Sequence, residues 1–182
     1  DLLALESLLK DDDALALIGP VHAQTKFSLL RTIYRWRASG MFDERHPRID
    51  FRKVLSDKGV ITSFSCLLTE HEDQAAVFMS VALKKIIEAK RRRWTSSRIT
   101  VLVKEASYIM GKYASRYFVL VARELERILR GGRSGGLSLI MDSQRLSDID
   151  VSSRRQLGMV IAMRCDRGEA RAFPAEYATR CA

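Results

Sequence analysis

The stretch from Ile99 to Arg145 reads ITVLVKEASYIMGKYASRYFVLVARELERILRGGRSGGLSLIMDSQR, and its pattern indicates the class of fold. It opens with the apolar, β-branched run Ile99–Val103 and closes with a second apolar run, Leu137–Met141. Between them, apolar residues recur at helical spacing from about Arg116 to Arg130, directly before a glycine pair. A strand, a helix and a strand in this order predict a βαβ unit with two parallel strands.

The same alternation extends outward along the chain. Short apolar runs predict three further strands, and longer stretches with helical periodicity predict helices over Lys26–Arg37 and from about Glu70 to Arg93. The additional strands are expected at Ala14–Gly19, Gly59–Phe64 and Met159–Met163. We therefore predict an α/β fold, a mainly parallel five-stranded sheet flanked by helices.

Length and composition indicate one soluble domain. The 182 residues fit a single domain over 1–182, with a core at about 14–164 and a tail at 165–182. No apolar run approaches the roughly 18 residues that cross a bilayer, so no membrane span is expected. The chain begins at Asp1 without an initiator Met, which predicts that an original N-terminus was removed or left out.

The three cysteines are an odd number at wide spacing: Cys66, Cys165 and Cys181. They fit neither a disulfide framework nor a zinc site, and they favour a reducing, intracellular compartment. The histidines, at positions 22, 46 and 71, have no partners at catalytic spacing. No metal site is therefore predicted from ligand spacing.

The charge of the chain points to an anionic partner. Lys and Arg total 31 against 22 Asp and Glu, a formal charge of +9, and basic residues cluster at Arg91, Arg92 and Arg93 beside Trp94. Stacking or pairing of this cluster, and of Trp36 with its flanking arginines, would suit nucleic acid. The alternative is a basic, soluble domain with solvated helix ends and packed tryptophans.

Polar segments follow three of the predicted strands. They are Lys104–Ser107, Asp142–Arg145 and Gly19–Lys26. Ligands of parallel α/β sheets bind at the carboxyl ends of the strands. We therefore expect the first strand to lie centrally, between the strands that lead to Glu105 and Gln144, so that the three segments converge.

This order of strand, Glu-Ala, long helix, Gly-Arg-x-x-Gly, strand and Ser-Gln-Arg resembles the HerA/FtsK superfamily of hexameric DNA-pumping ATPases, which includes VirB4-like and viral genome-packaging ATPases. The resemblance runs from about Ala14 to Arg164. It implies a RecA-like fold of the ASCE P-loop NTPase type that uses ATP and Mg²⁺. It also implies DNA as a partner, assembly with copies of itself or related ATPase subunits, and a cytoplasmic or virion-associated location.

Three catalytic positions follow from the resemblance. Glu105 matches the Walker B glutamate that polarises the attacking water, and Gln144 matches the γ-phosphate sensor. Arg133, or alternatively Arg145 or Arg154, matches the arginine that reaches the nucleotide of a neighbouring subunit. The plainer alternatives are a solvated carboxylate at a strand end for Glu105 and a surface arginine beside a glycine-rich turn for Arg133.

The phosphate-binding loop departs from the family pattern G-x-x-x-x-G-K-[ST]. Gly19-Pro20 begins it correctly, but His22 and Gln24 stand where glycines belong, and Thr25-Lys26 reverses the Lys-Thr order. Side chains would therefore fill the space in which backbone N–H groups hold phosphate.

The metal position also departs from the pattern, because Lys104 replaces the Walker B aspartate. A cation there repels Mg²⁺, although it leaves metal-free nucleotide binding open as a counter-charge. Two hypotheses follow. The chain is a degenerate ATPase domain kept as a structural or nucleic-acid-binding subunit; the alternative is an active ATP-driven DNA translocase or packaging ATPase working as a ring.

Overall fold

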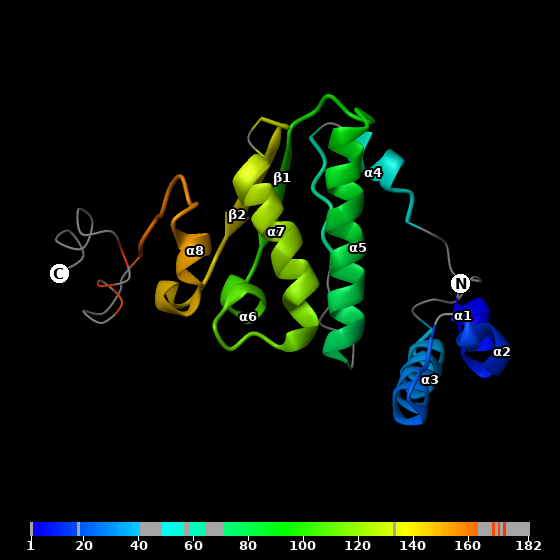
Figure 1. The fold of residues 1–182 in the computed structure, drawn as a ribbon. Helices are drawn as coiled ribbons and strands as arrows, with labels where there is room; N and C mark the ends of the chain where they lie inside the picture. Colours follow the sequence, from blue (N-terminus) through cyan, green and yellow to red (C-terminus); the bar gives the residue numbers. More distant parts are fainter. Residues whose placement is uncertain are drawn as a thin grey trace. The chain divides into compact units, whose positions relative to one another are not determined.

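The computed structural model describes residues 2–17, 19–40, 49–56, 59–64, 71–132, 134–163, 169, 171 and 173. The chain divides into two compact units, Asp1–Ile49 (unit 1) and Asp50–Ala182 (unit 2) (Figure 1). Within the described ranges, no helix has both the length and the apolar character needed to cross a membrane.

The described residues of unit 1 form three helices, α1 (Leu2–Lys10), α2 (Asp12–Ala16) and α3 (Ala23–Ala38). Their small core is formed by one buried residue from each helix, namely Leu9, Leu15 and Ile33. Buried Glu6 of α1 accepts hydrogen bonds of 2.6 Å from Lys10 Nζ and of 2.6 Å from Arg37 Nη1 of α3. The hydrogen bond from Lys10, followed by that from Arg37, lowers the pKa of Glu6 against the opposing effect of burial. This carboxylate therefore ties α1 to α3.

The strand predicted at Ala14–Gly19 is wrong, because the chain is helical there through Ala16. Asp11 is the N-cap residue of α2, and its Oδ1 accepts a 3.0 Å hydrogen bond from the Ala14 N–H. Acidic residues in the first turn and the strong helix propensity of Ala and Leu favour the same outcome. The N-cap thus favours a helix in a short apolar run whose periodicity alone does not distinguish a helix from a strand.

Unit 2 is built around one pair of strands, and most of its other elements are helical. The sheet joins β1 (Ile99–Val103) to β2 (Leu137–Met141) in parallel, in register from Ile99↔Leu137 to Val103↔Met141. The two strands predicted within Ile99–Arg145 and their parallel direction are confirmed. The helical elements are α4 (Phe51–Ser56), α5 (Glu72–Arg91), α6 (Ala106–Met110), η1 (Arg116–Phe118), α7 (Val119–Gly131), η2 (Leu146–Asp148) and α8 (Val151–Arg154).

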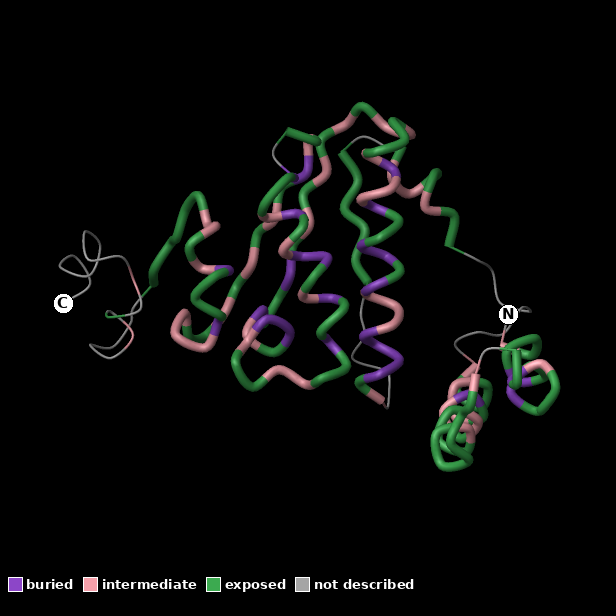
Figure 2. The backbone as a smooth tube through the Cα atoms, in the orientation of Figure 1, coloured by how far each residue is buried: buried purple, intermediate pink, exposed green. Residues whose placement is uncertain are grey.

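The core of unit 2 lies between the helices and one face of the sheet. Alternate strand residues are at least partly buried on that face, whereas Leu102 and Ile140 on the other face are 65% and 54% exposed. Figure 2 shows buried residues as stripes along α5 and α7, as expected for amphipathic helices packed on a sheet. The buried cluster comprises Ala76, Leu83, Ile86, Val103, Ala106, Ile109, Met110, Phe118, Val121, Leu125, Ile128, Leu137 and Ile149.

The predicted five-stranded, RecA-like sheet is wrong, because the described residues contain one sheet of two strands. Gly59–Phe64 and Met159–Met163 form no strand, and their apolar side chains are exposed, Ile61 by 95% and Ile161 by 81%. The expectation of a first strand between the other two is also wrong, because β1 and β2 pair directly. A short apolar run forms a strand only where a neighbour supplies backbone hydrogen bonds, and that neighbour is not encoded in the run itself.

Candidate functional site

The carboxyl ends of β1 and β2 bring Glu105 and Gln144 together. The strands are parallel and in register, so the residues that follow them lie at the same edge of the sheet. Gln144 Nε2 donates a 3.2 Å hydrogen bond to Glu105 Oε1, and both side chains are exposed. The sequence predicted this convergence of two polar side chains from residues 39 positions apart.

Glu105 is held in an unusual backbone conformation. Its φ of 52° and ψ of 51° lie in the left-handed region, which a residue other than glycine seldom adopts. The Glu105 N–H donates a 2.5 Å hydrogen bond to Asp142 Oδ1 of the segment after β2. Asp142 is itself fixed, because its N–H donates to Val103 O at 3.1 Å and its carbonyl accepts from the Ala106 N–H at 2.8 Å. Such conformations persist where surrounding contacts over-determine them, often at functional sites.

Asp142 is a positioning residue that sequence reasoning missed. Its place directly after β2 was visible in the sequence, but the hydrogen bond that its carboxylate accepts from the Glu105 N–H, just after β1, was not. Asp142 therefore ties together the two strand ends that carry Glu105 and Gln144.

The residues at this edge do not fit a bound Mg²⁺. Lys104 is exposed directly before Glu105, and the described residues contain no group of three or more His, Cys, Asp or Glu that could hold a metal ion. Magnesium needs several oxygen ligands in near-octahedral geometry. The edge does not supply that set of ligands. The Glu105 carboxylate accepts from Gln144, the Asp142 carboxylate accepts from the Glu105 N–H, and the Lys104 ammonium lies next in the chain.

A hollow of about 570 Å³ opens beside the Glu105–Gln144 pair. Its wall is anchored by an antiparallel bridge between Gly111 and Ile149 and by a 3.0 Å hydrogen bond from the Lys112 N–H to Asp148 O. The lining residues are Glu105, Ser107, Tyr108, Gly111, Lys112, Tyr113, Gln144, Arg145 and Asp148. Pockets of this size are typical of small-molecule sites.

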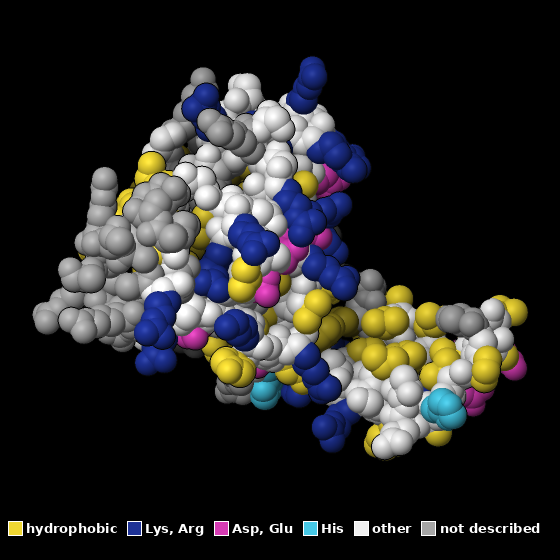
Figure 3. Space-filling model, turned by 60° about the vertical axis from the view of Figure 1, so that its left-hand side comes forward, with side chains coloured by type: hydrophobic (Ala, Val, Ile, Leu, Met, Phe, Trp, Pro, Cys, Tyr) yellow, Lys and Arg dark blue, Asp and Glu magenta, His cyan; other side chains and the backbone are white. Residues whose placement is uncertain are grey.

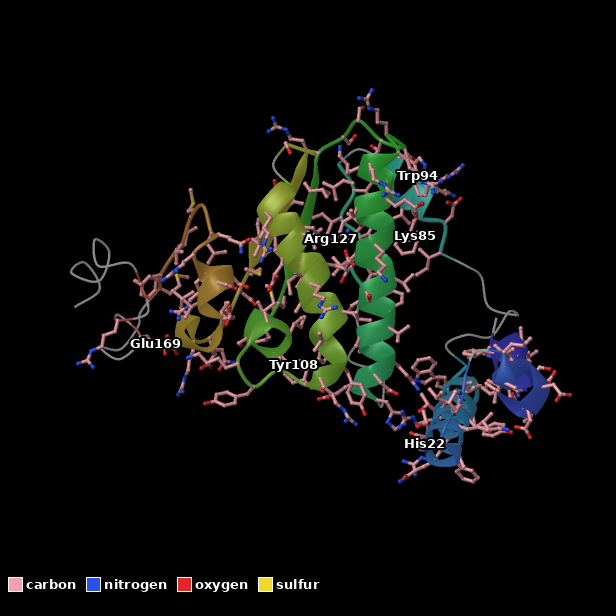
Figure 4. The ribbon with its side chains drawn as sticks, viewed as in Figure 1. His22, Lys85, Trp94, Tyr108, Arg127 and Glu169 are labelled. Atoms are coloured by element: carbon pink, nitrogen blue, oxygen red, sulfur yellow. The ribbon has the colours of Figure 1, made fainter. Side chains whose placement is uncertain are left out.

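Tyr108 is the best-anchored aromatic side chain of this hollow (Figure 4). Its hydroxyl donates to Glu72 Oε1 at the start of α5, and its ring meets Phe118 edge-on at 5.4 Å. The hydrogen bond to Glu72, with a smaller effect of burial, raises the pKa of Tyr108. In return, hydrogen bonds from Tyr108 and then Ser115 lower the pKa of Glu72. The Gly111-Lys112-Tyr113 turn that follows was the overlooked sequence signal for the hollow.

The altered phosphate loop, Gly19–Lys26, belongs to unit 1. It connects α2 to α3, with His22 as the N-cap residue of α3 and Gln24, Thr25 and Lys26 within that helix. Lys26 Nζ forms a 2.5 Å ion pair with Asp12 Oδ1. The lysine of this segment is therefore already engaged by a carboxylate, and Gly19-Pro20 precedes an ordinary helix start.

The basic cluster Arg91–Arg93 lies at the end of α5. All three side chains are exposed, and Arg92 Nε pairs with Glu88 Oε1 at 2.8 Å. Lys90 Nζ donates a 3.0 Å hydrogen bond to Ser97 O, just before β1 begins, so the cluster lies at the edge of the sheet opposite to Glu105. Figure 3 shows Lys and Arg side chains scattered over the face in view, among uncharged and acidic side chains.

The tryptophan beside this cluster is packed. Trp94 is half-buried, with the Arg52 guanidinium 4.8 Å from its ring centre. This contact between Arg52 and Trp94 supports the alternative that the tryptophan is packed against its own unit at the end of α5. Trp36 is likewise half-buried, within α3.

The candidates for the inter-subunit arginine lie in different places. Arg133 lies outside the described residues, as does His46. Arg145 lines the hollow beside Gln144, whereas Arg154 is half-buried in α8. Of the two described positions, Arg145 and Arg154, only Arg145 lies next to the predicted catalytic pair.

Comparison of the chain with protein-family models, with curated proteins and with solved structures finds no match.

Proposed function

We propose that this chain is a nucleic-acid-binding or structural subunit related to HerA/FtsK-like DNA motors, with an ATPase site that has lost hydrolysis. The observation that carries the proposal is the Glu105–Gln144 hydrogen bond across the carboxyl ends of two parallel strands. These are the two positions at which the resemblance implies a catalytic glutamate and a phosphate sensor. DNA is the proposed partner, in an assembly with copies of this chain or with related ATPase subunits.

Loss of hydrolysis is supported by three features of the described residues. Lys104 places an ammonium beside the position at which a Mg²⁺ ligand is needed, and no group of three suitable ligands surrounds it. Lys26, the lysine of the altered loop, is paired with Asp12. Without a metal ion and a phosphate loop, a glutamate at the strand end has no positioned water to activate.

An active ATPase is the second candidate, favoured by the intact Glu105–Gln144 pair. We expect the unaltered chain to hydrolyse Mg²⁺-ATP at background rate and Glu105→Gln to leave that rate unchanged, because a base without a positioned water contributes nothing. Steady-state phosphate release, with and without EDTA, measures both. Magnesium-dependent turnover that Glu105→Gln abolishes would establish the second candidate instead.

The nucleic-acid role predicts binding that weakens with salt. Each phosphate neutralised by a cation contributes about 0.9 to the slope of log K against log salt concentration. Reversing Arg91, Arg92 and Arg93 to Glu should therefore reduce the slope by up to about 2.7 and weaken binding to all sequences alike. Titration of labelled duplex DNA at several salt concentrations measures both quantities.

A matched control reverses three exposed cations elsewhere in unit 2, Lys84, Arg116 and Arg123. It changes the net charge by the same amount but leaves the basic cluster intact, so most of the affinity should remain. Equal losses in the two triple variants would assign binding to overall charge, and absence of any DNA binding would leave a purely structural role.

A further inference from the structure

The hollow beside Glu105 combines three kinds of side-chain chemistry. Tyr108 and Tyr113 supply aromatic rings, Lys112 and Arg145 supply cations, and Gln144 supplies an amide. All of these residues come from unit 2 and from two segments held together by the Gly111↔Ile149 bridge. The hollow is therefore complete within unit 2, without the altered phosphate loop.

We propose that this hollow binds a single nucleotide unit without a metal ion, with the base against the tyrosine rings and the phosphate against Lys112 and Arg145. The choice of a nucleotide over other aromatic anions rests on the proposed function. The ligand is either a free nucleotide or one unpaired residue of a single-stranded nucleic acid, since both present the same base and phosphate.

The tyrosine rings suit a base. Tyr108 is fixed by its hydrogen bond to Glu72 and by its contact with Phe118, so its ring is held in place before a ligand arrives. The Tyr113 side chain is 92% exposed, which leaves its ring free to stack. Aromatic side chains stack on any base, because every base has a π-face.

The two cations suit a phosphate. Neither Lys112 nor Arg145 forms an ion pair with a carboxylate of the described residues, in contrast to the cations of α7, where Arg127 pairs with Glu124 and Arg130 with Glu126. A guanidinium and an ammonium together can donate to several phosphate oxygens. They also supply the positive charge that Mg²⁺ provides at metal-dependent sites.

The carboxylates of the hollow suit the sugar or the base. Glu105 and Asp148 line it, and ionised carboxylates are hydrogen-bond acceptors only. Ribose hydroxyls and exocyclic amino groups are donors that can meet them. A bare phosphate offers neither a sugar nor a base to these carboxylates and rings.

The test measures binding of AMP, adenosine and inorganic phosphate to the full chain in EDTA. AMP should bind more tightly than either fragment, and Tyr113→Ala should weaken AMP binding roughly 5- to 140-fold, the range expected for loss of one stacked base. Arg145→Ala should weaken AMP binding but leave adenosine binding unchanged. A ten-residue oligo-dA then distinguishes the sources: binding tighter than AMP indicates a single strand, and weaker binding indicates a free nucleotide.

Matched controls are Tyr117→Ala and Arg155→Ala, which remove an exposed tyrosine and an exposed arginine outside the hollow. Both should bind AMP as the unaltered chain does. The proposal is overturned if AMP does not bind in EDTA, or if Tyr113→Ala and Tyr117→Ala have equal effects. It fails separately from the proposed function, because duplex binding through Arg91–Arg93 does not require the hollow.

Discussion

Replacing Gly111 by Ala should destabilise unit 2 by roughly 3 kcal/mol, the upper end of the usual range for overpacking, and abolish nucleotide binding in the hollow. A Cβ on Gly111 would lie 2.0 Å from the Ser107 carbonyl oxygen and 3.3 Å from that of Asp148. Both contacts are backbone atoms, so no side chain can turn aside to relieve them. The chain itself must move, and with it the Gly111↔Ile149 bridge and the turn that carries Tyr113.

Gly131→Ala is the matched control, because its Cβ would meet nothing within 4 Å at the end of α7. Alanine should be neutral there or stabilise by up to about 1 kcal/mol, as expected from helix propensity. Urea unfolding gives both free energies, and AMP titration reports on the hollow. An unfolding midpoint for Gly111→Ala equal to that of the unaltered chain would show that the backbone around Ser107 yields easily.

The sequence predicted the centre of unit 2 because several local signals agreed there. β1 and β2 are β-branched or apolar runs bounded by turn residues, and α7 between them ends at a glycine pair. Each of the two strands also has its pairing partner within Ile99–Arg145, so neither depends on a strand from a distant part of the sequence. The apolar residues at helical spacing along α5 are likewise buried or partly buried, namely Ala75, Met79, Ala82, Leu83, Ile86 and Ile87.

The other predicted strands failed because an apolar run does not specify its own surroundings. At Ala14–Gly19 the Asp11 cap outweighed the strand pattern. At Gly59–Phe64 and Met159–Met163 the residues are exposed and unpaired in the sheet, although their composition matches that of β1. Strand pairing depends on tertiary contacts, which five consecutive residues do not specify.

The sequence predicted only the part of the candidate site that lies directly after the two strands. Two polar residues after parallel strands must share an edge, which placed Glu105 with Gln144. The hydrogen bond from Glu105 N–H to Asp142 and the hollow around Tyr113 depend on backbone geometry and on a bridge between distant turns. Such contacts produce no periodic pattern of residues from which they could be predicted.

Leu125→Ala should lower the free energy of unfolding of unit 2 by about 2–5 kcal/mol. Leu125 lies in the middle of α7, is 0% exposed and belongs to the cluster between the helices and the sheet. Alanine would lose the transfer free energy of the side chain and leave a cavity that close-packed neighbours fill only in part. Since domains are stable by only about 5–15 kcal/mol, one such change removes a large share of the total.

Leu120→Ala is the matched control, because it makes the same chemical change in the same helix at a side chain that is 54% exposed. It should change the free energy of unfolding by no more than about 0.5 kcal/mol. Urea unfolding followed by circular dichroism measures both variants, and equal m-values would confirm that the same surface unfolds. If the two substitutions cost the same, α7 would not present its Leu125 face to a packed core. The strand ends that carry Glu105 and Gln144 would then lack the support that holds them together, because α7 connects β1 to β2 and packs on them.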